Sequence, residues 1–244
     1  MREAHATQTR SDCTFGTCRR CERRSHVVTD GVARGTLSRM TIRAALLDMD
    51  GTIYESDIDW RALRAEIELP WDGRPILTQL ADLDEGARER GTAALRRAEA
   101  DGAANGRIID GTHMLLDLFR ERGVACALVT NNSRRSAETV LARHGLRFDL
   151  VLTRDDGAAK PDPHLFTVAL ARLGVAPSEA LVVGDAHLDA IAAKAAGVGE
   201  VILVDTPPWM REHIPQDATF REARDLRHTC EIVSELLGPG GERG

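Results

Sequence analysis

Short apolar runs alternate with longer amphipathic stretches along most of the chain. The apolar runs are Ala44–Leu47, Ala125–Thr130, Asp149–Thr153, Ala180–Val183 and Val201–Val204. Apolar, β-rich runs separated by stretches of helix length are typical of βαβ units, which form a parallel sheet. The pattern therefore predicts an α/β fold with a doubly wound parallel sheet. In such a sheet the carboxyl ends of the strands share one edge, where ligands bind.

The pattern becomes purely helical between Ile53 and about Asp110. Three amphipathic segments follow one another there: one with Trp60, Leu63, Ile67 and Leu69, one with Ile76, Leu77, Leu80 and Leu83, and one over Ala87–Ala100. Their spacing is that of helices. We predict a small helical cap over residues 57–107, inserted into a core domain of residues 40–56 and 108–238. Large aromatic residues supply core area, so Trp60 and Trp71 are predicted to anchor the cap core.

Polar residues follow the first apolar run directly, as Asp48-Met49-Asp50-Gly51-Thr52. Two carboxylates at a strand end can hold a divalent cation while one of them attacks a substrate. Taken alone, the segment fits a turn or a helix cap equally well, because Asp-Gly is a frequent turn dipeptide. Later strand ends are similar, and carry Thr130-Asn131-Asn132-Ser133, Lys160-Pro161 and Gly184-Asp185 with Asp189 beyond.

In this order, the segments resemble the four motifs of the haloacid dehalogenase superfamily of phosphohydrolases, over roughly residues 42–206. The resemblance implies a Rossmann-like core and a phosphatase mechanism. Asp48 would be the nucleophile that forms an aspartyl-phosphate, and Asp50 the general acid and then the base. Phosphate oxygens would be held by Thr130, the backbone N–H of Asn131 and Lys160. Mg²⁺ would be bound by Asp48, Asp185 and the backbone carbonyl of Asp50.

The role of Asp189 stays open at this point. It lies one helical turn beyond Asp185, on the same side of a helix that begins near Ala186. It either orients the metal waters or Lys160, or is a solvated acid at a helix start. Lysine usage draws attention to Lys160, because only it and Lys194 among the 32 basic residues are lysines. Lys194, in an alanine-rich helical stretch, is expected to have no catalytic role.

Three features of the sequence argue against other activities known in this superfamily. Asp50 is present, whereas the dehalogenases lack this second aspartate. The segment 53–110 contains no lysine for a Schiff base, and no histidine occurs between His26 and His113, unlike in the phosphomutases that resemble β-phosphoglucomutase. The favoured function is a Mg²⁺-dependent phosphatase of a small phosphate monoester, similar to phosphoglycolate phosphatase. The alternatives are a phosphomutase or phosphotransferase using the same aspartyl-phosphate, and a non-catalytic scaffold with an N-terminal Cys/His metal-binding segment.

Substrate contacts beyond the phosphate are expected from the cap. Tyr54, Arg61, Arg64 and Arg74 are candidates, although each also fits an ordinary surface or packing residue. The sequence does not identify the ester.

Composition fits an enzyme domain rather than a binder of polyanions. Hydrophobic residues make up 43% of the 244 residues, the net charge is −6 and the pI is about 5.8. These values argue against nucleic acid or an anionic membrane as the main partner. No apolar stretch approaches the roughly 18 residues of a membrane span, and no signal peptide is recognisable. We expect a cytoplasmic protein that acts on a small phosphorylated metabolite, with its oligomeric state open.

The ends of the chain differ from the rest in composition. Residues 1–39 hold Cys13, Cys18, Cys21 and His26 amid polar residues. They are predicted to be disordered, to form a small metal-binding module, or to precede a true start at Met40. Residues 239–244 are predicted to be a flexible tail. Cys126 and Cys230 lie in apolar contexts and are interpreted as packing thiols.

Overall fold

A computed structural model describes residues 41–238. The predictions made for residues 1–40, including the cysteines and His26 and a start at Met40, lie outside the described residues. The prediction for the tail, 239–244, lies outside them as well.

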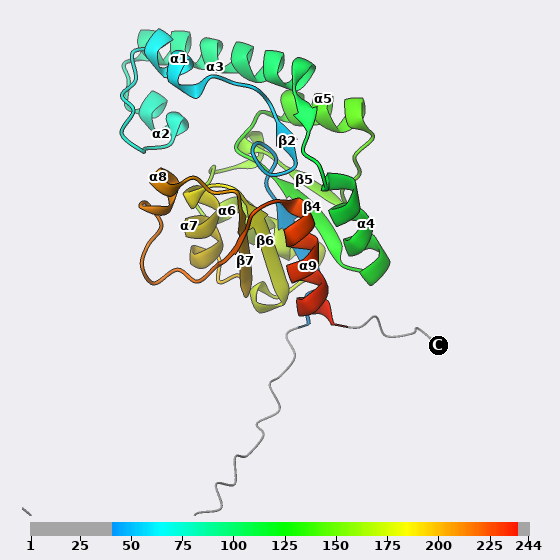
Figure 1. Ribbon diagram of the computed structural model, residues 1–244. Helices are drawn as coiled ribbons and strands as arrows, with labels where there is room; N and C mark the ends of the chain where they lie inside the picture. The colour runs from blue at the N-terminus through cyan, green and yellow to red at the C-terminus, as the bar shows by residue number, and fades with distance from the viewer. Residues whose placement is uncertain (1–40, 239–244) are drawn as a thin grey trace, which may run out of the picture. The chain divides into compact units, whose positions relative to one another are not determined.

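A six-stranded sheet forms the centre of the described part (Figure 1). All of its strand pairs are parallel. The order across the sheet is β5 (Leu150–Leu152), β4 (Ala125–Val129), β1 (Ala44–Leu47), β6 (Ala180–Gly184), β7 (Glu200–Val204) and β8 (Arg221–Ala223). The strand order reverses around β1, as it does in doubly wound sheets. The predicted α/β fold is therefore confirmed.

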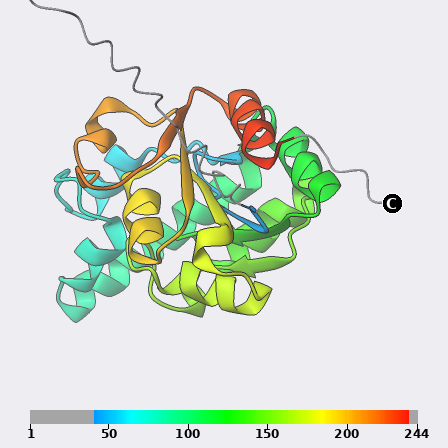
Figure 2. The same cartoon turned by 90° about the horizontal axis from the view of Figure 1, so that it is seen from below.

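Helices cover both faces of this sheet (Figure 2). One face packs against α4 (Thr112–Arg122), α5 (Arg134–His144) and α9 (Leu226–Leu237), and the other against α6 (His164–Leu173) and α7 (His187–Ala195). The central strands β1 and β6 are buried along their whole length. Strands covered on both faces need apolar residues at every position, which explains why the sequence shows continuous runs there rather than alternation.

Two short strands, β2 (Tyr54–Glu55) and β3 (Arg107–Ile108), pair antiparallel and frame the helical insert. Between them lie α1 (Trp60–Glu66), α2 (Ile76–Ala81) and α3 (Glu85–Asn105), in cyan to green in Figure 1. We call residues 57–106 the cap. Leu63, Leu80 and Leu95 form its small apolar core. The three predicted helical segments are present, while the domain limits drawn from the sequence stay a prediction.

The two cap tryptophans behave differently from one another. Trp60 is half-buried and packs against the cap core, as predicted. The prediction for Trp71 is wrong, because 42% of this residue is exposed. It lies in the turn between α1 and α2, outside any helix, so helical periodicity does not direct its side chain inward.

The remaining elements are short. They include the 3-10 turns Arg154–Asp156 and Pro177–Glu179 and the single-turn helix α8 (Pro208–Arg211). Over the described residues, no helix combines the length and apolar character needed to cross a bilayer.

Candidate active site

Three neighbouring strands bring the predicted site residues together. Asp48 follows β1, and its backbone N–H donates to the carbonyl of Val183 in β6, at 2.9 Å. Thr130 follows β4 and Asp185 follows β6. Because β4, β1 and β6 are adjacent and parallel, these residues emerge side by side at the carboxyl edge of the sheet.

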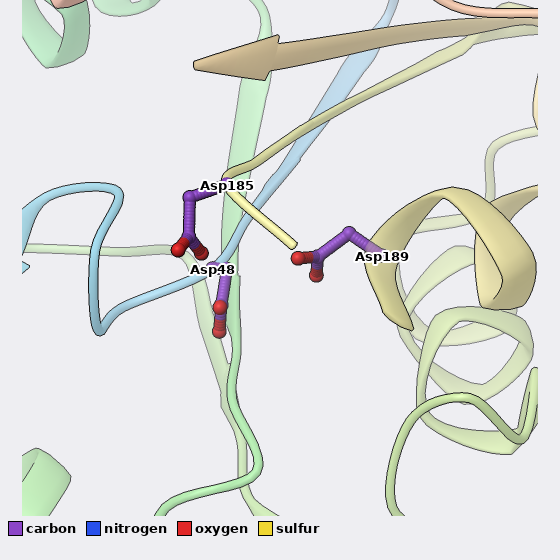
Figure 3. Close-up of side chains that lie close together, drawn as sticks. All are labelled: Asp48, Asp185 and Asp189. Carbon is purple, nitrogen blue, oxygen red and sulfur yellow. The ribbon is translucent and has the colours of Figure 1, made fainter. Parts of the chain in front are cut away.

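An acidic cluster forms where β1 and β6 end, with Asp189 reaching it from α7 (Figure 3). Carboxylate oxygens of Asp48, Asp185 and Asp189 all lie within 4.8 Å of one another. Thr52 donates a long hydrogen bond of 3.5 Å to Asp185 Oδ1. Like charges this close repel, so the cluster needs a cation to remain ionised.

Two glycines allow the carboxylates to approach the backbone. Gly51 has a φ of +78°, and a Cβ there would lie 2.3 Å from Asp185 Oδ2. Gly184 ends β6, and a Cβ there would lie 2.4 Å from Asp189 Cγ. Any side chain at either position would collide with the cluster. These glycines therefore set how tightly the acids can gather.

Lys160 supplies one positive charge to the cluster. Its Nζ lies 2.7 Å from Asp48 Oδ1 and 2.6 Å from Asp189 Oδ1, and donates to the carbonyl of Val129 at 3.0 Å. Asn131 holds the Lys160 backbone at both ends: Asn131 Oδ1 accepts from its N–H, and Asn131 Nδ2 donates to its carbonyl, each at 2.8 Å. A buried ammonium with two carboxylate partners is strongly fixed in place.

Burial and the neighbouring charges shift the pKa values of the clustered acids and of Lys160. Burial raises the pKa of Asp48 to about 7, although Lys160 opposes the shift. Burial, together with Asp48 and Asp189, raises the pKa of Asp185 well above its ordinary value. Burial alone would lower the pKa of Lys160, but Asp189 and Asp48 more than offset it and the pKa is raised. Three carboxylates thus share one ammonium, and a hard cation bound by oxygens fits the excess of negative charge.

Asp189 is almost fully buried, at 1% exposure, and is paired with Lys160. The reading as a solvated acid at a helix start is therefore wrong. The sequence places this residue in the first turn of α7, but it does not show that this turn lies next to the carboxyl ends of β1 and β6.

Asp50 has a different environment from Asp48. Asn132 Nδ2 donates to Asp50 Oδ2 at 2.8 Å, whereas Asp50 Oδ1 is buried without a hydrogen-bond partner. Burial raises the pKa of Asp50, and the bond from Asn132 lowers it. Asn132 was not among the predicted site residues. Its position in the turn that follows β4 could have suggested a role in the site. A turn sequence does not show, however, which of its side chains point toward the site.

The phosphate-binding candidates share one turn. Thr130 is buried, and its Oγ1 accepts from the N–H of Asn132 at 3.1 Å. Arg154 donates to the carbonyl of Asn131 at 2.9 Å and makes a bidentate ion pair with Glu99 of the cap helix α3. Glu99 is only 3% exposed. This cap–core ion pair was missed by sequence reasoning, because nothing in the sequence links a helix residue to a turn more than fifty positions away.

A pocket of about 440 Å³ opens between the sheet edge and the cap. Its core side includes Asp48, Asp50, Thr130, Lys160, Asp185 and His187, and its other side includes Trp60, Arg64, Trp71, Arg74, Leu95, Glu99 and Trp209. Pockets of this size hold ligands of drug-like dimensions.

The four candidate cap contacts separate into two groups. Tyr54 is fully buried, and its hydroxyl donates to the carbonyls of Gly102 and Ala103, so it packs rather than binds. Arg61 does not line the pocket, whereas Arg64 and Arg74 do.

Three residues predicted to have no catalytic role do not line the pocket: Lys194, Cys126 and Cys230. Lys194 is exposed and paired with Asp217. Cys126 and Cys230 are buried and free, and burial raises the pKa of their thiols to about 12 and about 11. These shifts keep both thiols protonated and unreactive.

Comparison with known proteins agrees with the geometry. Residues 42–197 match the family model of haloacid dehalogenase-like hydrolases. A phosphoglycolate phosphatase from Xanthomonas campestris is 32% identical over 180 residues, covering 65% of this chain and 81% of that protein. The mouse haloacid dehalogenase-like hydrolase domain-containing protein 3 is 36% identical over 134 residues, covering 53% of this chain and 50% of that protein. The crystal structure of a hydrolase from Pseudomonas syringae superposes with a TM-score of 0.69 at 19% identity, covering 80% of this chain and all of that one.

The chain belongs to the haloacid dehalogenase-like hydrolases. The predicted superfamily and the prediction of an enzyme are both confirmed, and the reading as a non-catalytic scaffold is wrong.

Proposed function

We propose that this hydrolase is a Mg²⁺-dependent phosphatase, which cleaves a small phosphate monoester through an aspartyl-phosphate on Asp48. The contrast between two acids carries the proposal. Asp48 lies 2.7 Å from the Lys160 ammonium, which favours its carboxylate form, whereas Asp50 accepts a hydrogen bond from the neutral amide of Asn132. Covalent transfer with acid assistance needs one ionised and one protonated acid.

In the first half-reaction, a carboxylate oxygen of Asp48 attacks phosphorus and the ester P–O bond breaks. The proton of Asp50 moves to the leaving oxygen, so the alcohol departs neutral. Burial shifts the pKa of Asp50 upward, the direction that favours its protonated form. General acid help of this kind is worth about 10²–10⁴ in rate.

In the second half-reaction, Asp50 has become a carboxylate and accepts a proton from water. The resulting hydroxide attacks phosphorus, the bond from phosphorus to Asp48 breaks, and inorganic phosphate leaves. Asp50 is again protonated and Asp48 again ionised. One water is consumed, and both residues return to their starting states.

The remaining polar groups have binding and positioning roles in this scheme. Lys160, Thr130 and the backbone N–H of Asn131 bind the phosphate oxygens. Asn131 also fixes the Lys160 backbone through its side-chain amide. Asp189 positions Lys160 by an ion pair of 2.6 Å. Groups fixed before the reaction stabilise developing charge more effectively than groups that must reorganise.

The residues present fit a magnesium ion. Asp48, Asp185 and the backbone carbonyl of Asp50 would hold it, and the surplus of clustered carboxylates over the single ammonium supports a cation at this place. When bound, the ion neutralises charge on the phosphate oxygens.

The relatives support a phosphate monoester as substrate, because the Xanthomonas protein is named for phosphoglycolate. A small phosphorylated metabolite and a cytoplasmic location are parts of this proposal that come from the sequence.

A phosphate-release assay on the purified chain tests the proposal. We expect release from several phosphate esters with Mg²⁺, none after the metal is removed with EDTA, and none from Asp48→Asn. Release that persists without divalent metal, or from Asp48→Asn, would contradict the mechanism. Transfer of the phosphoryl group to a second sugar hydroxyl, with no free phosphate, would instead identify a mutase.

A further inference from the structure

Two exposed tryptophans meet at the mouth of the pocket. Trp71 of the cap and Trp209 of α8 are 42% and 38% exposed. Their ring centroids lie 5.4 Å apart with an interplanar angle of 54°. Both rings line the pocket, although they come from separate parts of the chain. Exposed aromatic surface at a pocket rim is a mark of a ligand site rather than of ordinary surface.

A cation without a carboxylate partner lies against this aromatic pair. The Arg64 guanidinium is 5.1 Å from the Trp71 ring centroid, and its hydrogen bonds go to two neutral acceptors, Gln79 Oε1 and the carbonyl of Arg74. Burial lowers the pKa of Arg64, with only Asp72 opposing from beyond ion-pair distance. Arg74, by contrast, is paired with both Asp72 and Asp82. Arg64 is thus the pocket arginine with positive charge available for an anion.

A buried imidazole offers a third contact. His187, the first residue of α7, is 8% exposed and lines the pocket, and its Nδ1 has no hydrogen-bond partner. The centroid of its ring lies 5.3 Å from that of the His213 ring. A buried ring nitrogen without a partner is a place where a polar group of a ligand can form a hydrogen bond.

The size of the pocket agrees with these contacts. A two-carbon phosphate ester bound at Asp48 would leave most of the 440 Å³ empty. The space beyond the phosphate is lined by Trp60, Ile76, Leu77, Leu95 and Met210, which present apolar surface. An empty apolar volume of this size favours a bulky leaving group.

We propose that the leaving group of the substrate is a ring-bearing, largely apolar alcohol that carries an anionic group. The ring packs on Trp71 and Trp209, and the anion binds Arg64. The inference rests on the proposed function, because the phosphate at Asp48 fixes the other end of the substrate.

Calorimetric titration of the full chain with Mg²⁺ and non-hydrolysable phosphonates tests this assignment. The ligands are 4-carboxybenzylphosphonate, benzylphosphonate and phosphonoacetate. We expect the first to bind at least about tenfold more tightly than each of the others, because only this ligand presents both a ring to the tryptophans and a carboxylate to Arg64. Equal affinities, or no binding of any of the three, would overturn the proposal.

Matched variants assign the contacts. Arg64→Met is expected to abolish the advantage of 4-carboxybenzylphosphonate over benzylphosphonate. Arg61→Met removes an arginine that contacts the same Trp71 ring, 4.6 Å from its centroid, without lining the pocket, and should leave the advantage intact. Trp209→Ala should weaken both benzyl ligands and spare phosphonoacetate, with Trp209→Phe restoring most of the loss. Equal effects of the two arginine variants would overturn the role of Arg64.

The titration is independent of turnover. Hydrolysis of a minimal ester such as methyl phosphate, which is too small to reach the aromatic residues, reports on the proposed function alone. Failure of one experiment therefore leaves the other interpretable.

Discussion

The two sides of the pocket use charge in opposite ways. On the core side, Lys160 and Asp189 form an ion pair whose side chains are 2% and 1% exposed. On the cap side, Arg74 pairs with Asp72 and the side chains are 49% and 37% exposed. Breaking a buried pair costs about 3–5 kcal/mol, because it leaves an uncompensated charge, whereas an exposed pair contributes about 0–1 kcal/mol.

This difference suggests that the core side carries out the reaction and that the cap side determines which substrate binds. The core side tolerates little change, because each charged group depends on the others for its ionisation and position. Apart from the buried Glu99, the cap side presents partly exposed aromatic and basic groups whose replacement costs little stability. We therefore expect substitutions on the core side to remove turnover on every substrate, and those on the cap side to change the preference among substrates.

The two lysines give the sharpest form of the comparison. Lys160→Met should reduce turnover by at least about 10²–10³, the effect of removing one preorganised group that stabilises the transition state. Lys194→Met removes an exposed pair with Asp217 and should leave turnover unchanged. Steady-state kinetics on one aryl phosphate compares the two. Similar losses in both variants would show that Lys160 has no special role.

Glu99 tests the connection between the two sides. Glu99→Gln keeps the side-chain size but leaves the Arg154 guanidinium, whose side chain is only 13% exposed, without its anion, so we expect a loss of about 3 kcal/mol in stability. Glu66→Gln on the same cap removes an exposed pair with Arg97 and should cost less than about 1 kcal/mol. Urea denaturation measures both. Equal costs would mean that the cap–core ion pair does not hold the cap helix to the turn.

Asn132 should give the smallest of these effects. Asn132→Ala removes one hydrogen bond to Asp50, and we expect turnover on an alkyl phosphate to fall by about tenfold. The loss should be smaller on p-nitrophenyl phosphate, whose leaving group needs little protonation. An equal loss on both esters would show that Asn132 does not support Asp50 in its role as general acid.

The sequence predicted the core side of the pocket far better than the cap side. β1 and β6 are fully buried, so their continuous apolar runs end sharply at Asp48 and Asp185. The edge strand β8 is Arg-Glu-Ala with two exposed residues, and β2 has only two residues, so neither produces such a run. Strand ends in a parallel sheet converge by topology, which makes the site predictable from local patterns.

The missed features depend on contacts between distant segments. The contacts of Glu99 with Arg154, of Trp71 with Trp209 and of His187 with His213 form only in the folded chain. No local propensity or periodicity encodes such pairs. Trp71 was misjudged because aromatic residues are usually buried, and a position at a pocket mouth is the exception to that rule.

The most direct measurement is detection of the phosphoenzyme by mass spectrometry after rapid acid quench. With p-nitrophenyl phosphate and Mg²⁺, Asp50→Asn should accumulate one phosphoryl group on the peptide that contains Asp48. The good leaving group allows the first step without acid, whereas the water-dependent second step lacks its base. Asp48→Asn should carry none and should not turn over. Phosphoryl transfer to any other residue, or substantial turnover by Asp48→Asn, would contradict the assignment of Asp48 as the nucleophile.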